Sequence, residues 1–402
     1  MNLFFKKNSS PEEIEKQKKA LELEIEMNLS SIADLGKAYF FNLYFNLSHL
    51  NNCYNLKPCH QMMKNIPAII CGAGASLEQN FSSLKGLSEK ALIFSTGTAM
   101  TNMTKKDVFY HFGVGIDPNS PKRVQSHIEA APLFCTTSYA SDNFISYPYK
   151  KILTGGSGEL PWEEYVDQTI DLNLVKVDYG YNVTTLAIAI AHFLGCSPII
   201  LVGVDLCYEN NKYSGGIEEK NTYETIKTRD QNNKKVLTQK DWLLVKIWLE
   251  RFEEKYPKVL FNASNGLLLE KVSKGSLKEF FFDPMPSKNM QKMILNTCSK
   301  IFLDEKKLSS FFEKQYQDLI HIQKTINETG FEQITLETFE KIPFYQLFFI
   351  PFWTIFQGSF SSLMPSNLSI EEKKIHIKAQ KIAFLKQVLR THIPLFKEFL
   401  KK

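Results

Sequence analysis

The sequence contains no Cys-x-x-Cys pair, and its seven cysteines are scattered singly along the chain. Several of them lie inside apolar runs, where an unpaired cysteine behaves as a small buried hydrophobic residue. This spacing supports neither a zinc site nor a disulfide framework, so we expect no protein-bound metal and a cytoplasmic location. Residues 1–19 also lack an apolar segment long enough for a secretory signal peptide.

The net charge is also close to zero over most of the chain. The formal net charge is +5, but residues 371–402 hold nine basic and three acidic side chains, so the other 370 residues carry a net charge of −1. Proteins that bind nucleic acid contact its phosphates through clustered lysines and arginines, so a nearly neutral body argues against nucleic acid as a partner. The hydrophobic fraction of 44% excludes a disordered chain, and a length of 402 residues predicts two or three domains.

Residues 342–370 contain no charged side chain and are rich in aromatics. A membrane-spanning helix needs about 20 consecutive apolar residues. The run is interrupted by Pro343, Gln346, Pro351, Gln357 and Gly358. We therefore favour a buried pair of helices over a membrane span.

A basic helix is predicted behind this uncharged stretch. Its apolar face is formed by Ile375, Ala379, Ile382, Leu385 and Leu389, with lysines around it. Such a helix lies either in solvent or on an anionic membrane surface. Peripheral contact with the inner membrane surface through this helix therefore stays open.

The order of predicted elements divides the chain into three regions. Residues 1–64 read as helical, residues 65–274 alternate short Ile- and Val-rich runs with helices, and residues 275–402 read as helical up to the basic tail. The predicted strands are Ala68–Cys71, Ala91–Phe94, a short one within Val108–Gly115, Ile199–Val202 and Val259–Phe261. Strands that alternate with helices predict a Rossmann-like α/β fold with a doubly wound, mostly parallel sheet.

Two helices in the central region have recognisable first residues. Asn182 is expected to cap a helix over Val183–Leu194 that Gly195 ends. Thr238, with Asp241 three residues later, resembles a capping box that opens a second helix.

The first predicted strand is followed by a glycine-rich turn. In a parallel sheet, ligands bind beyond the carboxyl ends of the strands, and the amides at the start of the next helix face an anion. Gly72 and Gly74 let the backbone approach a ligand closely, and Ser76 can cap the helix or bond a phosphate. Leu77 stands where the dinucleotide fingerprint needs a third small residue, and no Gly-Lys-Ser/Thr follows, so nicotinamide binding and a P-loop are disfavoured.

Polar residues also follow the other predicted strands or begin the next helix. These further candidate ligand-binding residues are Ser95, Thr96, Thr98, Asn119, Asn182 and Thr184. Asp117 and Asp205 are the candidate catalytic carboxylates. They can hold Mg²⁺ between phosphates, or one of them can act as a base, and the spacing does not choose between these roles.

Several blocks of sequence resemble the central domain of the motility accessory factor (Maf) glycosyltransferase family. The first blocks are PAIICGAGASLEQN, ALIFSTGTAM and FGVGIDPN. Those downstream are GYNVTTLAIAIAHFLGCSPIILVGVDLCY, TRDQNNKKVLTQKDWLLVKIWLE and FNASNGLLLE, so the resemblance runs from about residue 67 to residue 270. It implies a core similar to bacterial sialyltransferases and a donor such as a CMP-linked nonulosonic acid held at the Gly72–Ser76 turn. It also implies transfer to Ser or Thr of a protein such as flagellin, without a required metal.

The chain departs from the family pattern after Gly-x-Asp-Leu, where many members carry a histidine. The stretch CYENNKYSGG has none, which leaves Tyr208 and Tyr213 as substitutes for the base. A phenol with a pKa of about 10 is a poor base unless its surroundings tune it. Two alternatives therefore remain: a Mg²⁺-dependent pyrophosphokinase resembling the archaeal 6-hydroxymethyl-7,8-dihydropterin enzyme, and an inactive interaction scaffold.

Overall fold

The computed structural model describes residues 10–119, 131–155, 161–208, 225–280, 289–329, 333–361 and 368–401. The chain forms two compact units. Unit 1 consists of Met1–Asn46, Asn52–Thr154 and Val177–Lys300, and unit 2 of Leu47–Asn51, Gly155–Lys176 and Ile301–Lys402. Each unit is thus assembled from three separate segments, whereas the sequence pattern places the region boundaries near residues 65 and 275.

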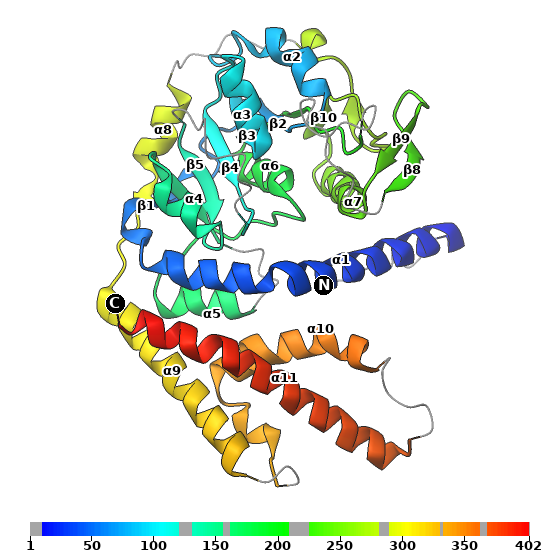
Figure 1. The fold of residues 1–402 in the computed structure, drawn as a ribbon. Coiled ribbons are helices and arrows are strands. Elements are labelled where there is room, and N and C mark those ends of the chain that lie inside the picture. Colours follow the sequence, from blue (N-terminus) through cyan, green and yellow to red (C-terminus); the bar gives the residue numbers. More distant parts are fainter. Residues whose placement is uncertain are drawn as a thin grey trace. The chain divides into compact units, whose positions relative to one another are not determined.

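Unit 1 is built around a sheet with the strand order β11-β10-β7-β2-β3-β4-β5-β6-β1-β12 (Figure 1). In this order the strands are β11 (Ser273–Lys274), β10 (Leu260–Asn262), β7 (Ile199–Val202), β2 (Ala68–Cys71), β3 (Leu92–Thr96), β4 (Phe112–Gly115), β5 (Leu133–Thr136), β6 (Lys151–Thr154), β1 (Cys53–Asn55) and β12 (Ser299–Lys300). All neighbours pair in parallel except β1 and β12. The predicted Rossmann-like α/β fold is confirmed.

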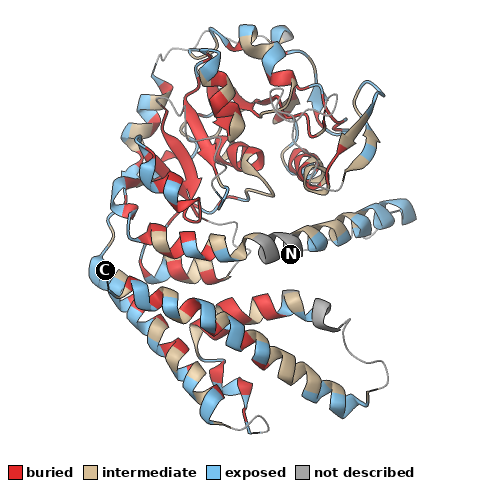
Figure 2. Cartoon of the chain, viewed as in Figure 1, coloured by how far each residue is buried: buried red, intermediate tan, exposed pale blue. Residues whose placement is uncertain are grey.

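The order of the strands reverses between β2 and β7. From β2 the chain adds β3, β4, β5 and β6 on one side, and it then returns to place β7 and β10 on the other. The central strands are buried along their length (Figure 2), which explains why they read as continuous apolar runs. The carboxyl ends of β2 and β7 therefore meet at the point where such sheets usually bind ligands.

The helices of unit 1 are α1 (Pro11–Leu47), α2 (Ser76–Leu84), α3 (Thr98–Lys105), α4 (Ser141–Ser146), α6 (Val183–Phe193), α7 (Lys240–Lys255) and α8 (Met290–Thr297). Helix α6 packs across β2, β3 and β4. Its predicted cap is confirmed, because Asn182 Oδ1 accepts the amides of Thr184 and Thr185 at 2.9 and 3.0 Å. Gly195, with φ of +89°, follows the end of the helix.

The predicted capping box at Thr238 is wrong. Helix α7 begins at Lys240, and its capping residue Gln239 makes no side-chain cap hydrogen bond. The Thr238 hydroxyl donates to the Leu206 carbonyl at 2.7 Å, because Thr238 still belongs to the hairpin of β8 (Ile226–Arg229) and β9 (Lys235–Thr238). The sequence pattern also missed strands β1 and β12, which lie in stretches that read as helical.

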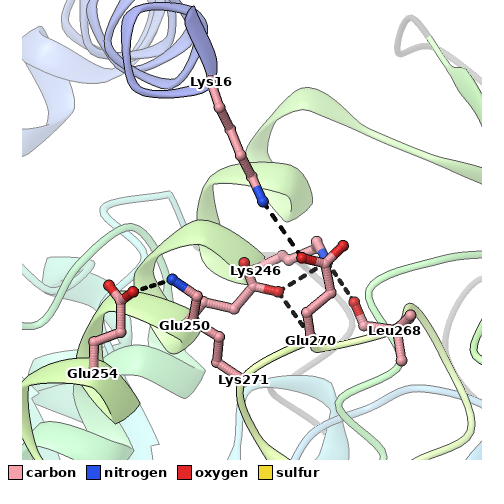
Figure 3. Close-up of polar contacts among 7 residues, drawn as sticks. All are labelled: Lys16, Lys246, Glu250, Glu254, Leu268, Glu270 and Lys271. Carbon is pink, nitrogen blue, oxygen red and sulfur yellow. Dashed lines mark hydrogen bonds and ion pairs between the residues drawn. The ribbon is translucent and has the colours of Figure 1, made fainter. Parts of the chain in front are cut away.

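Polar contacts hold the loop after β10 against α7, and one of them comes from α1 (Figure 3). Lys246 binds Glu250 at 2.9 Å, and the Glu270 amide donates to the same carboxylate at 2.9 Å. Lys16 of α1 pairs with Glu270 at 3.4 Å. Exposed pairs of this kind contribute about 0–1 kcal/mol each, so buried Glu250 is the member on which the network depends.

Unit 2 is helical. It contains α5 (Pro161–Thr169), α9 (Glu305–Glu328), the π-helical turn η5 (Phe344–Phe349), α10 (Ile350–Ser361) and α11 (Ile370–Phe399). The described part of the uncharged stretch forms one continuous helical segment, in which η5 runs directly into α10, so the expected pair of helices is not found there. Its burial is as expected in η5, where Phe344, Tyr345, Phe348 and Phe349 are buried. None of the described helices combines the length and hydrophobicity needed to cross a membrane.

The core of unit 2 is aromatic. Phe344 meets Trp162 of α5 with ring centroids 5.3 Å apart, and Phe348 meets His392 of α11 at 4.8 Å. Helix α11 packs against α9. Of the predicted apolar positions, Ile382, Leu385 and Leu389 are buried, whereas Ile375 is 53% exposed. The face therefore begins later along α11 than the spacing alone suggested, and contact of this helix with a membrane stays a prediction.

The buried imidazole of His392 makes the stability of the protein depend on pH. Burial lowers the pKa of His392 from 6.5 to about 4. The unfolded chain binds this proton at a higher pH than the folded chain, so the free energy of unfolding falls by up to ~3 kcal/mol as the pH is lowered through this window. We expect His392→Phe to flatten the pH dependence of denaturant unfolding between pH 7 and pH 4.5.

His321→Phe, on the exposed side of α9, is the matched control and should leave that dependence as in the parent protein. Equal pH dependence in the parent and His392→Phe would show that His392 does not titrate with folding.

Candidate functional site

The ends of β2 and β7 touch each other through glycines. The Gly74 amide donates to the Gly203 carbonyl at 2.7 Å, and a Cβ on Gly72 would lie 2.6 Å from that same oxygen. Gly203 has φ of +68°, a conformation that other residues rarely adopt. The glycines found by sequence reasoning therefore let two strand ends approach each other at the reversal point of the sheet.

Asp205 binds the start of α2. Its side chain accepts the Ser76 amide through Oδ2 at 2.8 Å, and the Ser76 hydroxyl donates to Oδ1. The residue is only 6% exposed, and the Asn265 amide also approaches Oδ1 at 3.4 Å. A carboxylate here occupies the position at a helix N-terminus that favours an anion. Asp205 thus caps α2. It binds the Ser76 amide and hydroxyl, which the sequence pattern had suggested as donors to a phosphate.

Other donors at this edge remain available. Among the described residues, the Ala73 and Ala75 amides have no hydrogen-bond acceptor, and both residues are half-buried. Buried Ser95 has a hydroxyl without a partner in the described part of the chain. Donors of this kind, next to helix N-termini, are suited to an anionic ligand.

The end of β3 joins this network to α6. The Thr96 hydroxyl donates to the Cys71 carbonyl at 3.0 Å, which ties β3 to the end of β2. Gly97, with φ of +49°, caps α3 without a side-chain hydrogen bond, and a Cβ there would lie 3.8 Å from Val183 of α6. The half-buried Thr98 at the first position of α3 is thus placed near the beginning of α6, where Asn182 and Thr184 lie.

Asp117 and Asn119 lie in a separate loop after β4. The Asn119 amide donates to Asp117 Oδ1 at 2.9 Å. Partial burial raises the pKa of the Asp117 carboxyl, and the Asn119 amide opposes this shift. Asp117 is nevertheless exposed, so its carboxylate is accessible and more basic than an ordinary aspartate.

Asn42 of α1 holds this loop and was missed by sequence reasoning. Its amide nitrogen donates to the Pro118 carbonyl at 2.7 Å, and its amide oxygen accepts the Ser141 hydroxyl at 2.7 Å. One turn later, Asn46 donates to the Thr137 carbonyl at 2.9 Å. The sequence shows only two asparagines four residues apart on a predicted helix. No local sequence pattern predicts which residues they contact.

Tyr208 is an unsuitable base as the structure places it. It is 4% exposed, its phenol is hydrogen-bonded to Gln239, and its ring lies 4.8 Å from that of Trp242. Tyr213 lies outside the described residues. His111, which flanks the Asp117 segment, is buried and accepts the Ile93 amide at 3.0 Å. Burial lowers the pKa of His111 to about 4.

The structure thus joins Gly72, Gly74, Ser76 and Asp205 in one network and leaves Asp117 in another. Whether these residues contact a ligand stays a prediction. In the described part of the chain, no group of three or more His, Cys, Asp or Glu side chains is placed to hold a metal ion.

The Ser76–Asp205 contact can be tested by Ser76→Ala. Removing the hydroxyl leaves one oxygen of a buried carboxylate poorly compensated, so we expect a loss of about 1–3 kcal/mol in the free energy of unfolding, measured by denaturant titration. Ser82→Ala, at an exposed position of the same helix, should change it by less than about 0.5 kcal/mol. Equal effects of the two substitutions would contradict the capping role of Asp205.

Comparison with known proteins gives two similarities. The profile of the family described as "6-hydroxymethylpterin diphosphokinase MptE-like" matches residues 41–211. The structure is similar to that of a Maf glycosyltransferase from Magnetospirillum magneticum AMB-1, with a TM-score of 0.61 and 13% sequence identity over 90% of this chain and 60% of that one. No curated protein matches. The predicted resemblance is therefore confirmed: the chain shares the fold of the matched 60% of this Maf glycosyltransferase, and its residues 41–211 are similar to the MptE-like family.

Proposed function

We propose that this protein is a glycosyltransferase that moves a sugar from a nucleotide donor of the CMP-nonulosonic or sialic acid type to Ser or Thr of a protein such as flagellin. The observation that carries the proposal is the structural similarity to a Maf glycosyltransferase over 90% of the chain. A match of this extent reaches into both units, because neither unit alone accounts for that share of the residues. The family profile, by contrast, ends at residue 211.

In this proposal the donor phosphate binds at the carboxyl edge of β2 and β3. The Ala73 and Ala75 amides and the Ser95 hydroxyl have no described partner, and α3 begins at Thr98 without a side-chain cap. These donors, with the positive end of the α3 dipole, oppose the negative charge that grows on the leaving phosphate. They supply this stabilisation without a resident metal.

The base in this proposal is Asp117. The acceptor hydroxyl attacks the anomeric carbon, the bond from that carbon to the phosphate oxygen breaks, and CMP leaves with the electron pair. The hydroxyl proton passes to the Asp117 carboxylate, whose raised pKa favours taking it. Asp205 acts as a positioning residue instead, since Ser76 binds both of its oxygens.

The proposal predicts nucleotide binding and sugar transfer, which can be measured in separate experiments. Calorimetry with CMP, UDP, ATP and NAD should show binding of CMP, and the assay with a CMP-linked nonulosonic acid should show transfer to a Ser- or Thr-containing acceptor. Asp117→Asn should keep CMP binding and lower kcat by roughly 10²–10⁴-fold, because only proton transfer is lost.

Asp107→Asn makes the same chemical change at an exposed position after α3 and should leave kcat unchanged. Absence of cytidine nucleotide binding at millimolar concentration, in protein shown to be folded, would overturn the proposal.

The match of residues 41–211 to the MptE-like profile favours a second candidate, a Mg²⁺-dependent pyrophosphokinase. This candidate predicts that ATP binds only with Mg²⁺ and that Asp117→Asn or Asp205→Asn abolishes the binding. Mg²⁺ coordination by Asp205 would compete with its bonds to Ser76, which is why we rank this candidate second. ATP binding with Mg²⁺ in the absence of CMP binding would reverse the ranking.

A further inference from the structure

Two cysteines that are far apart in the sequence face each other in unit 1. The Sγ atoms of Cys59 and Cys298 are 3.5 Å apart. Cys59 ends the short helix η2 (Lys57–Cys59), which follows β1, and Cys298 stands between α8 and β12. Both are buried, with exposed fractions of 0% and 7%. The contact joins the segment that follows β1 to the residue that precedes β12, and these two strands pair with each other at the edge of the sheet.

The two thiols are chemically distinct. Cys59 lies 3.6 Å from the Ile294 carbonyl, to which its thiol donates, and the Cys298 thiol then donates to Cys59. This hydrogen bond from Cys298 lowers the pKa of Cys59. The same hydrogen bond, together with burial, raises the pKa of Cys298. Cys59 is therefore the sulfur of the pair that ionises more readily.

We propose that Cys59 and Cys298 are a redox modification site that forms a reversible disulfide on reaction with hydrogen peroxide. The Cys59 thiolate attacks one peroxide oxygen, the O–O bond breaks, and the released hydroxide takes a proton to become water. Cys298 sulfur then attacks the Cys59 sulfenic acid. The S–O bond breaks, the S–S bond forms, and the oxygen leaves as a second water with the Cys298 proton.

The two-step oxidation is balanced in electrons and protons. Two thiols lose two electrons and two protons, and one peroxide is reduced to two waters. Excess low-molecular-weight thiol reverses the bond by thiol–disulfide exchange. A bond that forms transiently and is then reduced is the kind expected in a reducing compartment.

The disulfide would fasten the edge of the sheet. Strands β1 and β12 pair through only two residue pairs, Tyr54 with Lys300 and Asn55 with Ser299. So short a pairing opens easily, because few hydrogen bonds have to break. A covalent link from η2 to Cys298 would join the short helix that follows β1 to the residue immediately before β12. Lys300 is the last residue of unit 1 before the chain continues into unit 2.

Peptide mapping of the full chain tests the proposal. The native protein is treated with hydrogen peroxide, acid-quenched, unfolded in guanidinium with N-ethylmaleimide, and digested. We expect a cross-linked peptide containing Cys59 and Cys298 that disappears after treatment with dithiothreitol. Hydrogen exchange of β12 and α8 should slow in the oxidised protein.

Two variants serve as controls. Cys298→Ser should lose the cross-link, and Cys207→Ser, which alters a half-buried thiol elsewhere in unit 1, should retain it. Protein unfolded before peroxide treatment should give mixed pairings, which separates native proximity from random oxidation. Alkylation of both Cys59 and Cys298 in peroxide-treated native protein, or cross-links to other cysteines instead, would overturn the proposal.

Discussion

The contact between the ends of β2 and β7 is the constraint on which the arrangement of unit 1 depends. The Gly74 amide binds the Gly203 carbonyl, and the Asp205 carboxylate binds both polar donors of Ser76. These bonds lie where the strand order reverses and add to the pairing of β2 with β7, which joins the two halves of the sheet. A glycine-rich turn at this position is usually interpreted as a phosphate-binding loop. Here the Asp205 carboxylate occupies part of the anion-binding position in that loop.

This internal cap changes where an anionic ligand can bind. Since Ser76 is occupied, the available donors lie toward β3, where the Ala73 amide and the Ser95 hydroxyl have no described partner. The beginning of α3 is next to them and has no side-chain cap. In the proposed function, a phosphate that gains negative charge during transfer would meet these amides and the positive end of the α3 dipole.

The base of the proposed function, Asp117, lies on a loop that is separate from this contact. Asp117 is exposed, and the loop that carries it is held by Asn42 of α1. Asn42 thereby ties the long N-terminal helix α1 to the loop that carries Asp117. In unit 2 the uncharged aromatic stretch is used as core, with Phe344 and Phe348 packed against α5 and α11.

The sequence by itself determined the fold class, strands such as Ala68–Cys71 and Ile199–Val202, and the Asn182 cap. Each of these depends on residues that are neighbours in the chain, so local apolar runs and capping chemistry suffice to predict them. Only the tertiary structure decided that Asp205 caps α2, that Asn42 holds the Asp117 loop, and that Cys59 meets Cys298. Those partners are separated by 129, 76 and 239 positions along the chain. No local pattern encodes such a distance, because the fold of the sheet determines which distant residues become neighbours.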